Sequence, residues 1–117
     1  MKMSNSVLRV MNVVWENENI SAKNIAAELN SLCGWNKNTT YTVINQCIKK
    51  GLIERTEPDF MCRATVSREE VQANELKGMV DSVFKGSMNL MFSTLFENGS
   101  LSPKDIDELE RLIAKYK

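Results

Sequence analysis

The chain has 117 residues, 43% of them hydrophobic and 26% charged, and its 15 Lys/Arg balance its 15 Asp/Glu. This composition is typical of a globular protein and excludes a disordered chain. No apolar run reaches the roughly 18 residues of a membrane span, and no signal-peptide pattern opens the chain, so we expect a cytoplasmic protein with no membrane insertion.

The residues needed for most catalytic and metal chemistry are missing. Histidine is absent, which removes the commonest general base and metal ligand. Nucleophile-elbow, phosphate-loop, dinucleotide-binding and zinc-protease motifs are also absent. The three cysteines, Cys33, Cys47 and Cys62, form no CxxC pair. We expect no enzyme activity, no metal and no cofactor, and reduced thiols, with a redox or copper-sensing role for them as the alternative.

Two amphipathic helices are predicted at the start of the chain. Apolar residues recur at helical spacing over residues 5–17, where Ser4 or Ser6 can serve as N-cap. A second apolar face recurs over residues 22–32, with Ser21 as N-cap.

A third helix is predicted over residues 39–50, preceded by Lys37 or Asn38 and ended by Gly51 as a left-handed C-terminal residue. Its inner face consists of Thr40, Val43, Ile44 and Cys47. Its outer face consists almost entirely of hydrogen-bonding side chains, namely Asn38, Tyr41, Thr42, Asn45, Gln46 and Lys49.

Two segments rich in strand formers follow, residues 52–56 and 60–66, on either side of the turn sequence Glu57-Pro58-Asp59. Three short helices followed by a two-stranded hairpin is the order of a winged helix-turn-helix domain. We therefore predict a mostly α fold with a small β-hairpin wing, and place this domain at residues 1–66.

Residues 67–117 are predicted to form a helical dimerisation domain. Ser67 and Glu70 have capping-box spacing and begin a helix that ends near Gly86, Ser87 begins a helix that ends near Gly99, and Ser102-Pro103 opens the last one. The helix over 87–98 is apolar on all sides and needs burial on all sides. Homodimerisation is expected, with packing onto the N-terminal domain as the alternative. The proposed contacts are Leu90, Met91, Leu95, Phe96, Leu109 and Leu112.

The net charge does not by itself indicate nucleic-acid binding, because residues 1–65 carry eight Lys/Arg against six Asp/Glu and residues 66–117 seven against nine. The third helix does indicate it, since amide and hydroxyl side chains match base edges in the major groove. The candidate base-reading residues are Thr39, Tyr41, Thr42, Asn45 and Gln46. The candidate phosphate contacts are Lys37, Asn38, Lys49, Lys50, Arg55 and Arg63.

Six segments, in the same order along the chain, resemble the penicillinase-repressor (BlaI/MecI/CopY) family. They are VMNVVW at 10–15, SAKNI at 21–25, WNKNTTYTVI at 35–44, KKGLI at 49–53, VFKGS at 83–87 and LSPKDIDEL at 101–109. The resemblance implies a dimeric winged-helix repressor that binds a palindromic operator of double-stranded DNA and silences resistance or metal-homeostasis genes. It also implies that the third helix reads bases.

The β-lactam-responsive branch of this family is inactivated by cleavage within the dimerisation domain, under the control of a membrane sensor-protease. The matching position in this chain is Thr94-Leu95. The CxC signature of the copper-responsive branch is absent, which disfavours copper sensing. Two alternatives to a β-lactam repressor stay open: a winged-helix regulator that responds to another signal, and a protein-interaction module with the same fold.

Overall fold

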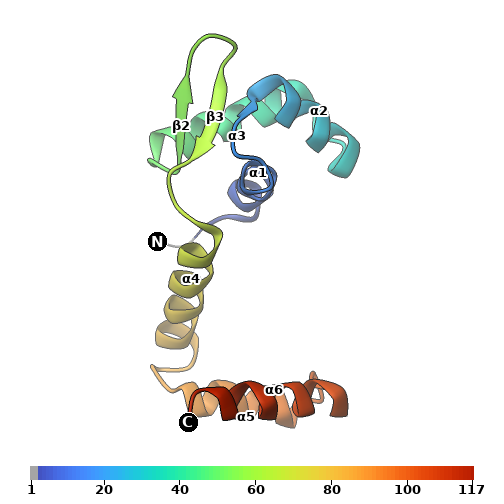
Figure 1. The fold of residues 1–117 in the computed structure, drawn as a ribbon, viewed down its shortest axis with the longest axis vertical. Helices are drawn as coiled ribbons and strands as arrows, with labels where there is room; N and C mark the ends of the chain where they lie inside the picture. The colour runs from blue at the N-terminus through green and yellow to red at the C-terminus, as the bar shows by residue number, and fades with distance from the viewer. Residues whose placement is uncertain (1–2) are drawn as a thin grey trace. The chain divides into compact units, whose positions relative to one another are not determined.

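The computed structural model describes residues 3–117, and within them the chain has six helices and a three-stranded antiparallel sheet (Figure 1). The predicted fold class, mostly α with a small β wing, is confirmed. The chain divides into two compact units, one ending at Leu76 and the other running from Lys77 to Lys117. The division falls inside helix α4 (Arg68–Val83), ten residues beyond the predicted boundary at residue 66.

The first two helices begin where their serine caps predict. Helix α1 (Asn5–Trp15) starts after Ser4, whose side chain accepts a hydrogen bond from the Val7 backbone N–H, and it ends two residues before the predicted end. Helix α2 (Ala22–Cys33) starts after Ser21, whose side chain accepts from the Asn24 backbone N–H. Each cap satisfies a backbone donor that a helix N-terminus leaves without a partner.

Helix α3 (Lys37–Lys49) starts two residues earlier than predicted. Its N-cap is Asn36, whose side-chain oxygen accepts from the Thr39 backbone N–H at 2.8 Å. Lys37 and Asn38 therefore lie in the first turn of the helix and not before it. The predicted end is confirmed, because Gly51 follows the helix with a left-handed φ of +78°.

The sheet contains one strand that sequence analysis missed. Strands β2 (Ile53–Thr56) and β3 (Met61–Ala64) form the predicted hairpin, which extends from the helices in Figure 1. A two-residue strand β1 (Ile20–Ser21) pairs with β3, so the strand order is β1-β3-β2. The wing is consequently attached to the start of α2 as well as to the end of α3.

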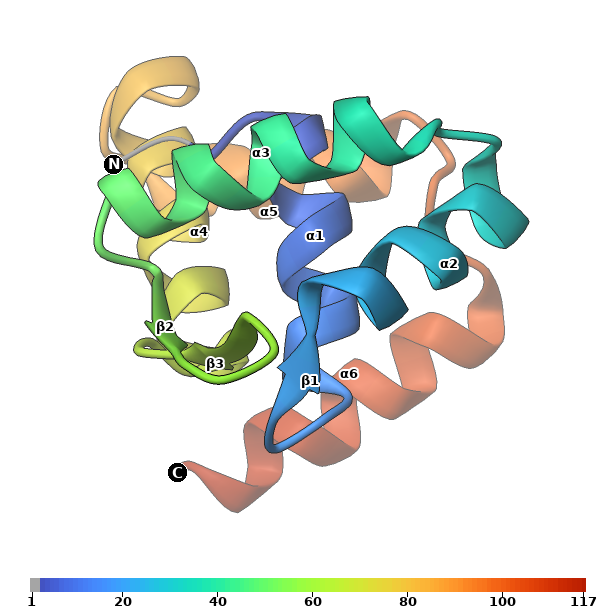
Figure 2. The ribbon, with the colours of Figure 1, turned by 90° about the horizontal axis from the view of Figure 1, so that it is seen from above.

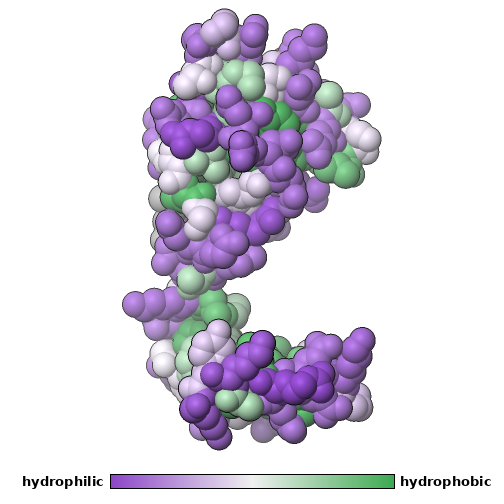
Figure 3. Space-filling view, in the orientation of Figure 1, coloured by the Kyte–Doolittle hydropathy of each residue, from purple (hydrophilic) through white to green (hydrophobic). Residues whose placement is uncertain are grey.

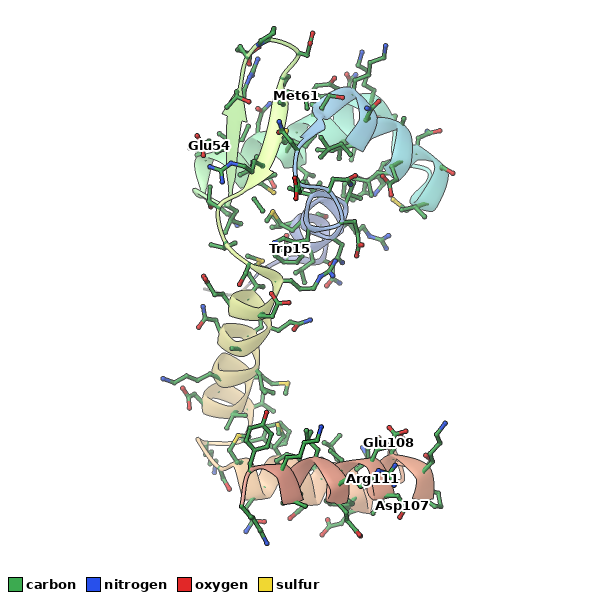
Figure 4. All side chains as sticks on the ribbon, viewed as in Figure 1. Trp15, Glu54, Met61, Asp107, Glu108 and Arg111 are labelled. Carbon is green, nitrogen blue, oxygen red and sulfur yellow. The ribbon has the colours of Figure 1, made fainter. Side chains whose placement is uncertain are left out.

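The core of the first unit lies between α1, α2, α3 and the sheet. Figure 2 shows α3 crossing α1, with α2 beside them. Fully buried side chains include Val10, Met11, Ile25 and Ile44. Trp15 lies half-buried at the end of α1 (Figure 4), and its Nε1–H donates to the Val66 carbonyl at 2.9 Å. This hydrogen bond attaches the segment that follows β3 to the end of α1.

The second unit contains the end of α4, helix α5 (Met88–Glu97) and helix α6 (Pro103–Lys115). Ser87 caps α5, as predicted. Ser102 caps α6 with Pro103 at its first position, and a complete capping box with Asp105 is present that was not predicted. At α4, Ser67 accepts from the Glu70 backbone N–H, which is one of the two bonds expected there.

Candidate nucleic-acid interface

The two faces of α3 separate as predicted. Thr40, Val43, Ile44 and Cys47 are at most 6% exposed and pack into the core. The opposite face presents Thr39, Thr42, Asn45 and Gln46 to solvent. Because the buried face fixes the helix about its axis, these four hydrogen-bonding side chains point outward together.

Tyr41, the fifth predicted base reader, differs from the other four. It is half-buried, and its ring packs edge-to-face on the ring of Phe60, with 5.8 Å between the ring centroids. Its apolar body is therefore part of the packing between α3 and the wing. Among the exposed four, the Thr42 hydroxyl donates its proton to the Asn38 carbonyl at 2.9 Å, so the hydroxyl oxygen keeps both lone pairs as acceptors.

Positive charge lies at both ends of α3. Lys37 occupies the first turn and Lys49 the last, and Lys50 follows the helix; all three are exposed. Asn38 is exposed beside Lys37, at the N-terminus where unpaired backbone N–H groups favour an anion. The arrangement places cationic or amide groups beyond each end of the polar face.

The wing arginines are each paired with a carboxylate, which sequence analysis did not predict. Arg55 donates through Nε to Glu57. Arg63 donates through Nη2 to Glu54, which lies directly opposite it across β2 and β3. Glu54 is labelled on β2 in Figure 4. The two-residue spacing of Arg55 and Glu57 could have revealed the first pair; the second depends on strand register.

The ion pair affects Glu57 as expected for a carboxylate beside a cation. The hydrogen bond from Arg55 lowers the pKa of Glu57, because a neighbouring cation favours the ionised carboxylate. Both pairs are exposed to solvent. Each wing carboxylate therefore competes with any anion that approaches its arginine.

In the second unit, large apolar side chains reach the surface, while the face of α6 that carries Asp107, Glu108 and Arg111 is polar (Figures 3 and 4). Of the predicted dimerisation residues, Leu90, Phe96 and Leu112 are 47–48% exposed, and Leu95 and Leu109 are half-buried. Met91 is only 7% exposed within the single chain, so it packs inside its own protomer. Phe92, on the helix predicted to be apolar on all sides, is 37% exposed. Further exposed apolar residues, which sequence analysis did not assign to this surface, are Met79, Val83, Met88 and Ile113.

The predicted cleavage position lies within α5. Thr94 is exposed, its hydroxyl donates to the Leu90 carbonyl at 2.8 Å, and Leu95 is half-buried. A protease needs an extended substrate backbone, so the helix has to open locally before this bond can be cut.

The three thiols are free, and they differ in burial. Cys47 of α3 and Cys62 of β3 are fully buried, and desolvation raises the pKa of each to about 11. Cys33 at the end of α2 is half-buried.

None of the helices between residues 3 and 117 has the length and apolar character needed to cross a membrane.

Comparisons with known proteins agree with this geometry. The penicillinase repressor family model matches residues 3–115. The methicillin resistance regulatory protein MecI of Staphylococcus aureus (strain N315) is 28% identical, covering 97% of this chain and 94% of that protein. The penicillinase repressor of Bacillus licheniformis is 26% identical, covering 99% of this chain and 92% of that protein.

Solved structures support the winged-helix fold. The solution structure of the DNA-binding domain of the repressor BlaI matches 59% of this chain and 87% of that domain, with a TM-score of 0.55 and 24% identity. A multiple antibiotic-resistance repressor (MarR) from Listeria monocytogenes matches with a TM-score of 0.54 and 16% identity. Together with the family match over nearly the whole chain, these results give the assignment: the chain belongs to the penicillinase repressor family of DNA-binding transcriptional repressors.

Proposed function

We propose that this protein represses antibiotic-resistance genes by binding a palindromic operator as a homodimer in the cytoplasm, with α3 in the major groove. The observation that carries the proposal is the outer face of α3. Four exposed hydrogen-bonding side chains stand on a helix that the core holds by its other face. Such a helix presents donors and acceptors to base edges without rearranging first.

The individual roles follow from the chemistry of each side chain. Gln46 and Asn45 have amides that can bond adenine bidentately, and the Thr42 methyl suits the thymine methyl. Lys37, Lys49 and Lys50 are point charges at the helix ends and suit phosphates. Tyr41 contributes at most its outer edge, because its ring packs on Phe60.

A salt titration of binding to the DNA upstream of the protein's own gene tests the proposal. Gln46→Ala should weaken binding to the preferred site by about 1–3 kcal/mol and leave binding to random DNA unchanged. Lys49→Ala should weaken both and reduce the salt slope by about one. Binding that shows no preference for any site would contradict the proposal and favour a protein-interaction module.

Dimerisation is supported by the apolar surface of the second unit. Phe96, Leu112, Val83 and Ile113 are between 48% and 65% exposed in one chain. A second copy that covers these residues would remove that surface from water, which is the dominant favourable term in protein association. Dimer formation would also supply the two recognition helices that a palindromic operator requires.

Induction by proteolysis is the second part of the proposal and follows from the family. A cut at Thr94-Leu95 would remove the end of α5 and all of α6 from the chain, and with them Phe96 and Leu112. An immunoblot of the native cells before and after β-lactam exposure tests it, with a membrane sensor-protease as the expected partner. Induction with only full-length repressor present would contradict cleavage and indicate another signal.

A further inference from the structure

Four side chains connect the recognition helix to the wing in a continuous stack of cations and aromatic rings. The Lys37 ammonium lies 5.6 Å from the centre of the Tyr41 ring, and both residues belong to α3. The Tyr41 ring meets the Phe60 ring edge-to-face at 5.8 Å. The Arg55 guanidinium lies over the Phe60 ring, 3.5 Å from its centroid, and Arg55 belongs to β2. We call these four residues the cation–aromatic bridge.

Phe60, at the centre of the bridge, has an unusual backbone. Its φ is +50°, in the left-handed region that bulky side chains rarely adopt, and it follows Asp59, whose φ is +74°. The Phe60 carbonyl accepts a hydrogen bond from the Ala22 backbone N–H at 2.9 Å, beside the pairing of β1 with β3. A strained conformation persists only where its surroundings impose it, and such positions are concentrated at functional sites.

The two ends of the bridge are cations in the candidate interface. Arg55 uses Nε for Glu57 and the face of its guanidinium for Phe60, so its Nη groups are the ones left to donate to a phosphate. Arg63 is held differently, because its Nη2 already donates to Glu54. Of the two wing arginines, Arg55 is the one whose guanidinium lies against an aromatic ring.

We propose that Phe60 is a positioning residue for DNA binding: its ring holds Arg55 of the wing at a fixed place relative to α3, so that wing and recognition helix engage the backbone of one half-site together. This inference rests on the proposed function. Phe60 itself needs no contact with DNA. The backbone conformation of Phe60 directs its ring towards Arg55, and the ring orders the Arg55 side chain before DNA binds. Arg55 therefore loses less rotamer freedom on binding.

The test is a double-mutant cycle on operator affinity, with fluorescence anisotropy at several salt concentrations. Phe60→Leu, which keeps apolar bulk but removes the aromatic face, should weaken binding by about threefold to thirtyfold, the range that a cation–aromatic contact supplies. It should also reduce the salt slope by about one, as loss of a phosphate contact does. Phe60→Tyr keeps the ring and should bind as the unaltered protein does.

The same change in an Arg55→Gln background should have little further effect, because the group that Phe60 positions is then gone. Phe60→Gly provides a second variant, since glycine adopts a positive φ without strain. Relief of the backbone strain offsets only part of the packing that is lost with the ring, so the melting temperature should fall while binding weakens as it does for Phe60→Leu.

Several outcomes overturn the inference. An equal loss for Phe60→Leu in both backgrounds would mean that Phe60 does not act through Arg55. Unchanged affinity for Phe60→Leu, or failure of both Phe60→Leu and Phe60→Gly to fold, would mean that the ring has only a structural role. If the unaltered protein shows no preferred site on DNA, the proposed function itself fails, and that result is distinct from the others.

Discussion

Phe96→Ser is the sharpest test of the dimerisation surface. Phe96 lies on α5 and is 48% exposed in the single chain. Full burial of a phenylalanine side chain contributes about 1.5–3 kcal/mol. The half that its own protomer leaves exposed therefore contributes about 0.7–1.5 kcal/mol when a second copy covers it.

In a twofold dimer the same patch is used by both protomers. The two copies of Phe96 together then stabilise the dimer by about 1.5–3 kcal/mol, which corresponds to a change in the dimer Kd of about tenfold to a hundredfold. Operator binding at low protein concentration should weaken in parallel, because a monomer holds one half-site.

Sedimentation equilibrium over a range of concentrations measures this shift. Leu32→Ser is the matched control, since Leu32 is 69% exposed but belongs to α2 in the other unit. It should leave the dimer Kd unchanged. The reasoning is refuted if Phe96→Ser folds and dimerises as tightly as the unaltered chain, or if Leu32→Ser dissociates the dimer equally.

Four further predictions concern the first unit. The Thr40 hydroxyl is buried with no hydrogen-bond partner among the described residues, so Thr40→Val should stabilise by about 1–3 kcal/mol, and a lower melting temperature in calorimetry would contradict this. Gly51→Ala should destabilise the protein by about 1–2 kcal/mol in urea unfolding, because the φ of Gly51, +78°, is disfavoured for a residue with a Cβ. The cost is conformational, since no atom lies within 4 Å of the position that the Cβ would occupy. An unchanged unfolding midpoint would argue against this backbone conformation. At pH 8 a thiol reagent should label Cys33 quickly and the buried Cys47 and Cys62 only after unfolding. Because burial raises the pKa of the latter two to about 11, stability should fall as the pH rises from about 9 to 11, and a flat profile would contradict this.

Local signals were sufficient to predict the starts of most helices. Ser4, Ser21, Ser87 and Ser102 each accept a hydrogen bond from a backbone N–H three residues later, an interaction that needs no distant partner. The two faces of α3 were also predictable, because helical periodicity alone separates apolar from polar positions. The end of α3 was predictable for a related reason, since Gly51 adopts a left-handed conformation that other residues disfavour.

Features that depend on long-range pairing were decided by the tertiary structure. Strand β1 has only two residues, and it is a strand because β3 lies beside it. The pairing of Arg63 with Glu54 follows from the register of β2 and β3. Such contacts join residues whose separation along the chain carries no periodic signal.

The sequence by itself therefore determined which face of α3 is polar and that residues 67–117 are too apolar for their own helices to bury. Only the tertiary structure decided which of those apolar residues remain exposed, with Met91 turned into its own protomer and Phe96 turned partly outward. It also decided that Tyr41 packs on Phe60 at the edge of the proposed DNA interface. The physical reason is that composition determines how much apolar surface a segment carries, whereas packing against specific neighbours determines which atoms lose contact with water.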